Sequence, residues 1–151
     1  MFERILVAFD GTPESRRAYR AALELALRFH SSLTIAIVHP PSRTPDGSEL
    51  QRLVPIDSEG KTIAMLLEEM EADARSRGIT SMSPVYLQGE VTPALVDYLK
   101  RVPHDLAVVG SRGLSRGRRL LLGSVSSGLA TDAPCAVLVV RTSRTGRAGE
   151  P

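Results

Sequence analysis

Short apolar runs alternate along the chain with longer segments in which apolar residues return every three or four positions. The runs are rich in valine, isoleucine and leucine, and they predict five strands at residues 4–10, 32–39, 83–89, 105–110 and 135–141. The segments between them predict four helices at residues 12–29, 61–78, 92–102 and 124–133. Strands and helices therefore alternate from one end of the pattern to the other.

Residues that favour helix ends support these limits. Thr12 can cap the first helix, with Pro13 at its first position, and Gly78 is expected to end the second helix. For the third helix we expect Thr92 as the cap and Pro93 at the start.

The alternating order defines the fold class. A strand that is apolar on both faces, such as residues 32–39, is typical of a buried parallel sheet. We therefore expect one α/β domain, an open doubly wound sheet of five parallel strands with helices on both faces. Such sheets bind ligands beyond the carboxyl ends of the strands, where the strand order reverses. Asp10 ends the first strand and Gly110 the fourth, so both face one crevice if those strands are neighbours.

Charge and cysteine content indicate the kind of partner and the cellular location of the protein. The net charge is +2, but residues 1–109 carry 12 Lys and Arg against 15 Asp and Glu, whereas residues 110–151 carry 7 Arg against 2 acids. This asymmetry favours an anionic partner near the C-terminal end, and a solvated arginine-rich loop explains it equally well. Cys135 is the only cysteine, which excludes an internal disulfide and favours a reducing, cytoplasmic location.

Two further expectations concern segments outside the regular pattern. Residues 40–60 contain four prolines and are too long for an ordinary connection, so we expect a surface loop there. The chain starts with a strand, without an apolar leader, and its apolar runs are too short to span a bilayer. We expect neither a membrane nor a nucleic acid as a partner.

A frame of glycines follows the fourth strand, with the spacing Gly110-x2-Gly113-x9-Gly123-Ser124. Gly110 and Gly113 let the backbone turn sharply and approach a ligand closely. Gly123 and Ser124 open the last helix, and a helix N-terminus offers N–H groups and partial positive charge to a phosphate. Four arginines stand in the same stretch, Arg112, Arg116, Arg118 and Arg119. The segment therefore predicts an anion site that suits a polyphosphate.

Each of these features also has a purely structural explanation. Ser124 is a good N-cap with or without a ligand, single glycines are common in turns, and residues 120–123 are more typical of core packing. The chain has no G-x-x-x-x-G-K-[ST] loop, and the first strand–helix turn, FDGTPE, has one glycine only. The sequence SVSSG misses the G-x-S-x-G hydrolase elbow because it begins with serine. A ligand is favoured because the glycines fall just after a strand and just before a helix.

The glycine frame resembles the nucleotide-binding signature of the universal stress proteins, in their ATP-binding branch. The stretches ILVAFDGTPES, DLAVVGSRG and APCAVLVVR are similar to that family in order and position. The resemblance implies one nucleotide-binding domain at residues 1–141, followed by a disordered polar tail at residues 142–151. It also implies the strand order 3-2-1-4-5 and ATP as the ligand. Any metal is expected to be Mg²⁺ bound through the phosphates, because no cluster of His, Cys, Asp and Glu has ligand spacing.

The resemblance further implies which residues contact the nucleotide. Asp10 and Val38 lie at the adenosine end, and the flanking backbone comes from Ala8, Phe9 and Val109. The residues that hold the ribose and phosphates are Gly110, Arg112, Gly113, Gly123, Ser124, Val125 and Ser126. The resemblance implies neither a catalytic residue nor a metal ligand from the protein.

Three functions are compatible with these features. The first is an ATP-binding regulatory protein of the stress response. The second is a slow ATPase or nucleotidyl transferase on the same fold. The sequence lacks a paired base and nucleophile, which argues against this function. The third is a dimeric protein-interaction module whose nucleotide site stays empty. The glycine frame argues against this function. We also expect a homodimer through the fifth strand, from Cys135 to Arg141, because an uncharged, proline-free edge invites pairing with another chain.

Overall fold

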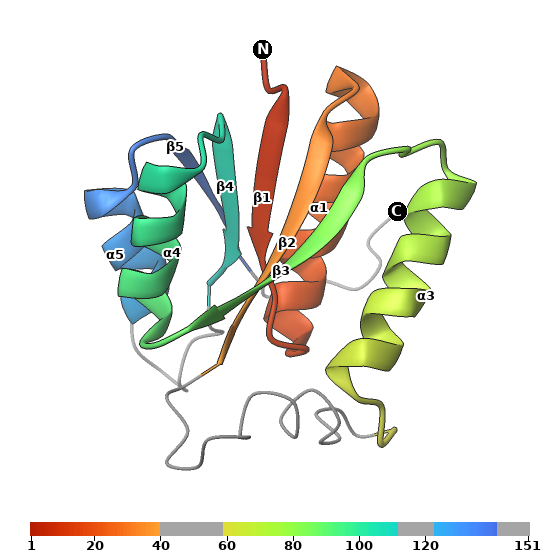
Figure 1. Ribbon diagram of the computed structural model, residues 1–151, viewed down its shortest axis with the longest axis horizontal. Helices are drawn as coiled ribbons and strands as arrows, with labels where there is room; N and C mark the ends of the chain where they lie inside the picture. Colours follow the sequence, from red (N-terminus) through yellow and green to blue (C-terminus); the bar gives the residue numbers. More distant parts are fainter. Residues whose placement is uncertain (40–58, 112–122, 142–151) are drawn as a thin grey trace, which may run out of the picture.

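The computed structural model describes residues 1–39, 59–111 and 123–141, in which strands and helices alternate (Figure 1). The strands are β1 (Arg4–Ala8), β2 (Ser32–His39), β3 (Met82–Gln88), β4 (Leu106–Gly110) and β5 (Ala136–Val140). The helices are α1 (Pro13–Phe29), α3 (Ile63–Ser76), α4 (Val91–Arg101) and α5 (Ser124–Asp132). All nine predicted elements are present. The 142–151 tail and most of the 40–60 loop lie outside the described residues.

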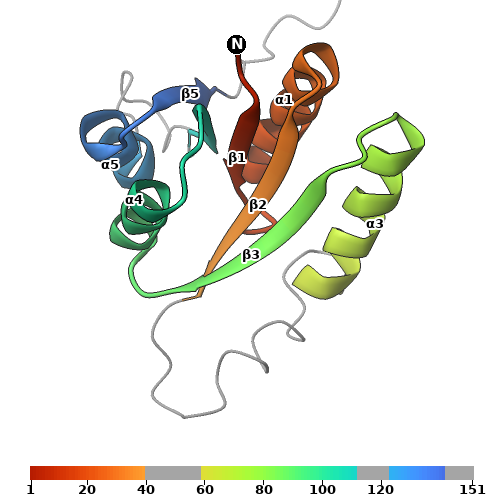
Figure 2. The same cartoon turned by 45° about the horizontal axis from the view of Figure 1, so that its top comes forward.

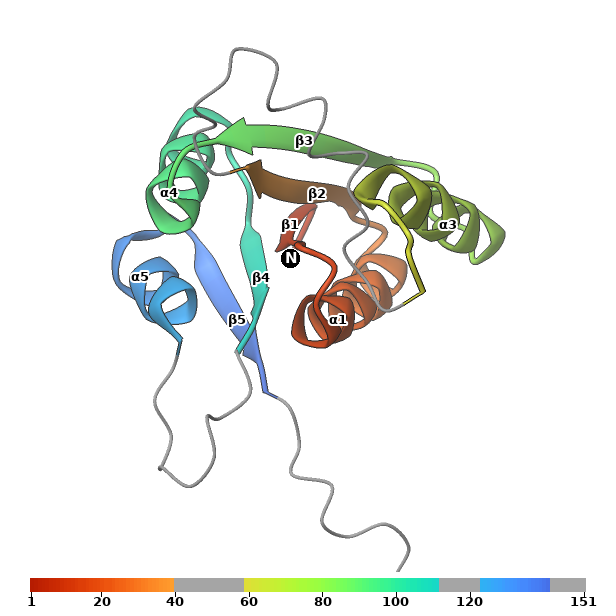
Figure 3. The same cartoon turned by 90° about the horizontal axis from the view of Figure 1, so that it is seen from below.

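The five strands form one parallel sheet in the order β3-β2-β1-β4-β5, which confirms the predicted doubly wound fold. Helices α1 and α3 cover one face of this sheet, and α4 and α5 cover the other (Figures 2 and 3). The central strand, β1, pairs with β2 on one side and with β4 on the other. The strand order therefore reverses between β1 and β4, and their carboxyl ends flank the switch point.

The sheet separates two apolar cores. Ile5 and Val7 of β1 pack in the core on the α1 and α3 side, whereas Leu6 packs in the core on the α4 and α5 side. This division follows from the alternation of strand side chains between the two faces. All three side chains are fully buried. Burial on both faces explains why the described interiors of β1 and β4 are continuous apolar runs without alternating polar residues.

Two predicted helix limits, at Thr12 and Gly78, are confirmed. The Thr12 hydroxyl accepts a hydrogen bond from the Ser15 N–H at 3.2 Å, and Pro13 is the first helical residue. After α3, Gly78 has a φ of 102°, and the N–H groups of Gly78 and Ile79 return to carbonyls of the last turn. This is the Schellman arrangement, which requires a left-handed residue and therefore favours glycine.

The predicted cap at Thr92 is wrong. Helix α4 begins at Val91, two residues before the predicted start at Pro93, and Glu90 takes the cap position without a side-chain capping bond. Thr92 packs against α5 instead, because a Cβ atom added at Gly128 would lie 2.4 Å from the Thr92 Cγ2. The threonine methyl fills the space that the glycine leaves between the two helices. Packing between helices therefore explains both residues.

Gly128→Ala is expected to destabilise the protein by about 1–3 kcal/mol, because the added methyl overlaps that of Thr92. Thr92→Ser removes the threonine methyl, so in that background the substitution is expected to become neutral or stabilising. Alanine then contributes its helix propensity, about 1 kcal/mol better than glycine. Urea unfolding of the wild type, the two single variants and the double variant measures the coupling. An equal cost of Gly128→Ala in both backgrounds would contradict the contact.

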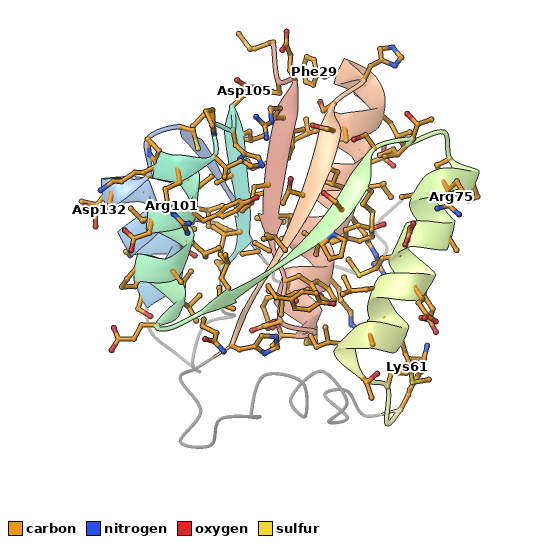
Figure 4. The ribbon with its side chains drawn as sticks, viewed as in Figure 1. Phe29, Lys61, Arg75, Arg101, Asp105 and Asp132 are labelled. Carbon is orange, nitrogen blue, oxygen red and sulfur yellow. The ribbon has the colours of Figure 1, made fainter. Side chains whose placement is uncertain are left out.

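Asp105 joins β4 to β1 at the amino edge of the sheet, where Figure 4 shows it beside the start of the chain. Its Oδ2 accepts hydrogen bonds from the N–H groups of Glu3 and Arg4, both at 2.8 Å. The Asp105 N–H donates in turn to the Arg4 carbonyl at 2.9 Å. The bonds from the Arg4 and Glu3 N–H groups hold the pKa of this carboxyl below its ordinary value.

Asp105→Ala is therefore expected to lower the free energy of unfolding at neutral pH. Because the folded pKa is depressed, the stabilisation is fully present above the unfolded pKa and is lost as the pH falls through the folded pKa. The difference between wild type and variant is expected to narrow below about pH 4. Urea unfolding across a pH series measures it, with Asp97→Ala on the exposed side of α4 as the control. A difference that does not vary with pH would argue against a role for the charge.

Cys135 is partly buried, against the core formed with α4 and α5. This burial raises the pKa of its thiol.

In the ranges that the structure describes, no helix is both long enough and apolar enough to cross a membrane.

Candidate functional site

A cleft opens at the carboxyl edge of the sheet, where β1 and β4 end side by side. This is the lower edge in Figure 1, and Figure 3 views the molecule from that side. The lining residues come from the ends of strands and the starts of helices: Ala8, Phe9, Asp10, Thr12, Glu14, Ser15, Ala36, Val38, Val91, Val109, Gly110, Gly123, Ser124, Val125 and Ser126. The cleft therefore lies at the switch point that the strand order defines.

The turn from β1 into α1 forms one wall of the cleft. Gly11 has a φ of 84°, which allows the chain to turn directly after Asp10. The Asp10 Oδ1 accepts hydrogen bonds from the Thr12 N–H at 3.0 Å and from the Thr12 hydroxyl at 2.6 Å. The buried Ser15 hydroxyl donates to the Thr12 carbonyl at 3.0 Å. This wall is thus a hydrogen-bonded turn that fixes the orientation of one carboxylate.

The end of β4 lies directly against the first turn of α1. A Cβ atom added at Gly110 would lie 2.5 Å from the Glu14 carbonyl oxygen and 2.8 Å from its carbonyl carbon. Backbone atoms cannot rotate out of the way, so any side chain at this position would push α1 away from the sheet. Helix–strand packing therefore requires glycine at position 110, in addition to the close ligand approach that the sequence predicts.

The start of α5 forms the opposite wall. Gly123 takes the cap position, and because glycine has no side chain it makes no side-chain capping bond to the N–H groups of the first turn. Ser124 is the first helical residue and is exposed, so the alternative in which Ser124 caps this helix is wrong. The Ser126 hydroxyl is buried and donates to the Gly110 carbonyl at 3.3 Å, which joins α5 to β4.

Ten of the twelve residues predicted to contact the nucleotide line this cleft. They are Ala8, Phe9, Asp10, Val38, Val109, Gly110, Gly123, Ser124, Val125 and Ser126. The other two, Arg112 and Gly113, lie outside the described residues, as do the remaining arginines of the glycine-rich stretch. The fold thus gathers these ten residues at one place, while their contact with a nucleotide stays a prediction.

Five lining residues were missed by the sequence prediction: Thr12, Glu14, Ser15, Ala36 and Val91. Ala36 lies two positions before Val38 on β2, so the alternation of strand side chains could have found it. Glu14 lines the cleft because α1 starts beside Gly110, a contact between distant segments that no local pattern reveals.

Asp10 and Glu14 are the carboxylates among the lining residues. In the described ranges, no group of three or more His, Cys, Asp and Glu could hold a metal ion.

A parallel sheet in this strand order, with a cleft at its switch point, defines the class as a doubly wound α/β domain. Within that class, the chain belongs to the universal stress protein family, whose model matches residues 1–141. It is 32% identical over 152 residues to universal stress protein YxiE of Bacillus subtilis, covering 93% of this chain and 100% of that protein. A universal stress protein of Thermus aquaticus is 32% identical over 144 residues, with coverages of 93% and 100%. The family predicted from the sequence is therefore confirmed.

Solved structures of the same family share the fold. One, described as a universal stress protein in complex with cAMP, matches with a TM-score of 0.74 and 30% identity, covering 94% of this chain and 99% of that one. Universal stress protein UspA from Lactobacillus plantarum matches with a TM-score of 0.67 and 25% identity, covering 92% and 97%.

Proposed function

We propose that this protein binds an adenine nucleotide, ATP in the first place, in the cleft between β1, β4 and α5, and acts as a regulatory protein of the stress response. The proposal rests on the start of α5 at Gly123, which has no side-chain cap and faces the same cleft as the Asp10 carboxylate. The relative of 30% identity described in complex with cAMP supports an adenine nucleotide as the ligand class. The proposed domain is residues 1–141, in the cytoplasm.

The two walls of the cleft differ in charge, which suggests how the nucleotide is oriented. The first turn of α5 offers N–H groups and the positive end of the helix dipole, which suit phosphates. The α1 wall carries Asp10 and Glu14, whose charges repel phosphates and whose oxygens accept hydrogen bonds. In the proposed complex, the phosphates therefore lie at Gly123 and Ser124, with the adenosine toward Asp10. Arg112 and Gly113 complete the proposed phosphate contacts.

Mg²⁺ fits this arrangement as an ion carried by the phosphates. It prefers oxygen donors and keeps several waters, so it rarely needs a complete set of protein ligands. Glu14 supplies a carboxylate oxygen of the cleft that could approach it, directly or through water, whereas Asp10 lies at the proposed adenosine end. The ion would supply charge neutralisation between the phosphates and this acidic wall.

Gly123→Val is expected to weaken ATP binding by about tenfold or more, because a branched side chain at the helix start occupies the space proposed for the phosphates. Calorimetric titration with ATP and Mg²⁺ measures the affinity, and urea unfolding verifies that the variant is folded. Ala130→Val is the matched control, because it adds the same side chain on the exposed side of α5. Equal affinities of Gly123→Val and the wild type would contradict the proposed phosphate site.

A slow ATPase or nucleotidyl transferase stays the alternative function. The two can be separated after the binding experiment, by measuring whether bound ATP is recovered intact or releases phosphate in a single turnover. Recovery of intact ATP supports a protein that holds the nucleotide, and rapid release of phosphate supports the enzyme.

We further propose that two copies associate through β5. Among the described residues, this strand lies at the edge of the sheet and pairs with β4 alone, and β5 itself contains no charged residue. The Leu138 side chain is 37% exposed, which is unusual for leucine in a strand of a buried sheet. An uncharged edge can pair with the same strand of a second copy about a two-fold axis, which gives a closed dimer.

Leu138→Lys is expected to shift a dimer toward monomers, because it places a charge in the proposed strand pair. Light scattering over a range of micromolar concentrations measures the change. Met65→Lys introduces the same charge on α3, at a side chain that is 48% exposed, and is expected to leave the dimer intact. A wild-type protein that is monomeric at every concentration would rule out the proposed interface.

A further inference from the structure

Thr12 uses one hydroxyl group for two different hydrogen bonds. Its oxygen accepts from the Ser15 N–H at 3.2 Å, which caps α1, and its hydrogen is donated to the Asp10 Oδ1 at 2.6 Å. A helix cap requires only the first of these bonds. The second is the shorter of the two, and it connects the cap to a carboxylate that lines the cleft.

The two oxygens of the Asp10 carboxylate have different surroundings. Oδ1 accepts hydrogen bonds from both donors of Thr12, from its N–H at 3.0 Å and from its hydroxyl at 2.6 Å. Two donors on one oxygen restrict rotation of the carboxylate about its Cβ–Cγ bond. In the part of the chain that the structure describes, no hydrogen bond is formed by Oδ2. Oδ2 is therefore the acceptor that this residue offers to a ligand in the cleft.

Ser15 holds the Thr12 side of this arrangement in place. Ser15 is only 6% exposed, and its hydroxyl donates to the Thr12 carbonyl at 3.0 Å. The Asp10 N–H donates to the same hydroxyl at 3.4 Å. The three residues thus form a closed ring of hydrogen bonds at the start of α1, and the carboxylate is oriented before any ligand arrives.

We propose that Thr12 is a positioning residue for nucleotide binding, which orients the Asp10 carboxylate so that Oδ2 meets hydrogen-bond donors of the nucleoside. This inference rests on the proposed function, because it requires a nucleotide in the cleft. An acceptor that is already oriented loses little conformational freedom on binding, so the orientation increases affinity. Thr12 then strengthens binding through Asp10, beyond any contact of its own with the ligand.

Capping alone predicts a different response to substitution. Glycine is tolerated at a helix N-cap almost as well as threonine, so Thr12→Gly removes the hydroxyl bond to Asp10 with little effect on α1. Thr12→Ser keeps the hydroxyl and both of its bonds. If Thr12 acts only as a cap, all three proteins bind ATP equally well.

The test compares ATP binding, by calorimetry with Mg²⁺, for the wild type, Thr12→Ser and Thr12→Gly, alongside urea unfolding of each. Thr12→Ser is expected to bind like the wild type, and Thr12→Gly about three- to tenfold more weakly, the effect of one lost hydrogen bond. In an Asp10→Ala background, Thr12→Gly is expected to cause no further loss, because the hydroxyl acts through Asp10. A substitution that distorts the cleft as a whole would instead weaken binding equally in both backgrounds.

Inorganic tripolyphosphate, which lacks the nucleoside, provides a second readout. Wild type and Thr12→Gly are expected to bind it with the same affinity, and a loss there would mean that the substitution distorts the whole cleft. Equal ATP affinity of wild type and Thr12→Gly, or an additive loss in the Asp10→Ala background, would overturn the positioning role and leave the nucleotide site standing. Failure of the wild type to bind ATP would instead overturn the proposed function, and this inference with it.

Discussion

The cleft depends on the contact between Gly110 and the backbone of Glu14. Because no side chain separates them, the end of β4 and the first turn of α1 lie within van der Waals distance. On its other side, the Gly110 carbonyl accepts the hydrogen bond of the Ser126 hydroxyl, which draws the start of α5 to the same strand end. One glycine thus sets the distance between the two walls, and a side chain there would move both.

Helices α1 and α5, which both start at this cleft, complete their first turns differently. Thr12 caps α1 with its hydroxyl and also binds Asp10, so the α1 wall presents a carboxylate of fixed orientation. Helix α5 begins at Gly123 without a side-chain cap, so its wall presents backbone N–H groups. An acceptor therefore faces a set of donors across the cleft. This difference supports a ligand that has hydrogen-bond donors at one end and negative charge at the other, as a nucleotide has.

Local patterns predicted the elements of the fold, whereas the strand order and most of the cleft residues were implied by the family resemblance. Thr12 and Gly78 could be placed from sequence because capping depends on a few neighbouring residues. The same reasoning failed at Thr92, which has the right residue type beside a proline but packs its methyl against Gly128 of another helix. It also failed for Ser124 as a candidate cap of α5, because Gly123 occupies the cap position and Ser124 is the first helical residue.

By itself, the sequence determined the order of the elements, the parallel sheet and the segments that meet at its carboxyl edge. These follow from apolar periodicity and from glycines at strand and helix ends, which are local properties of the chain. Only the tertiary structure determined that Gly110 and Gly128 must lack side chains and that Glu14 lines the cleft. Each of these depends on atoms from a distant segment, and the packing that brings them together has no counterpart in local sequence.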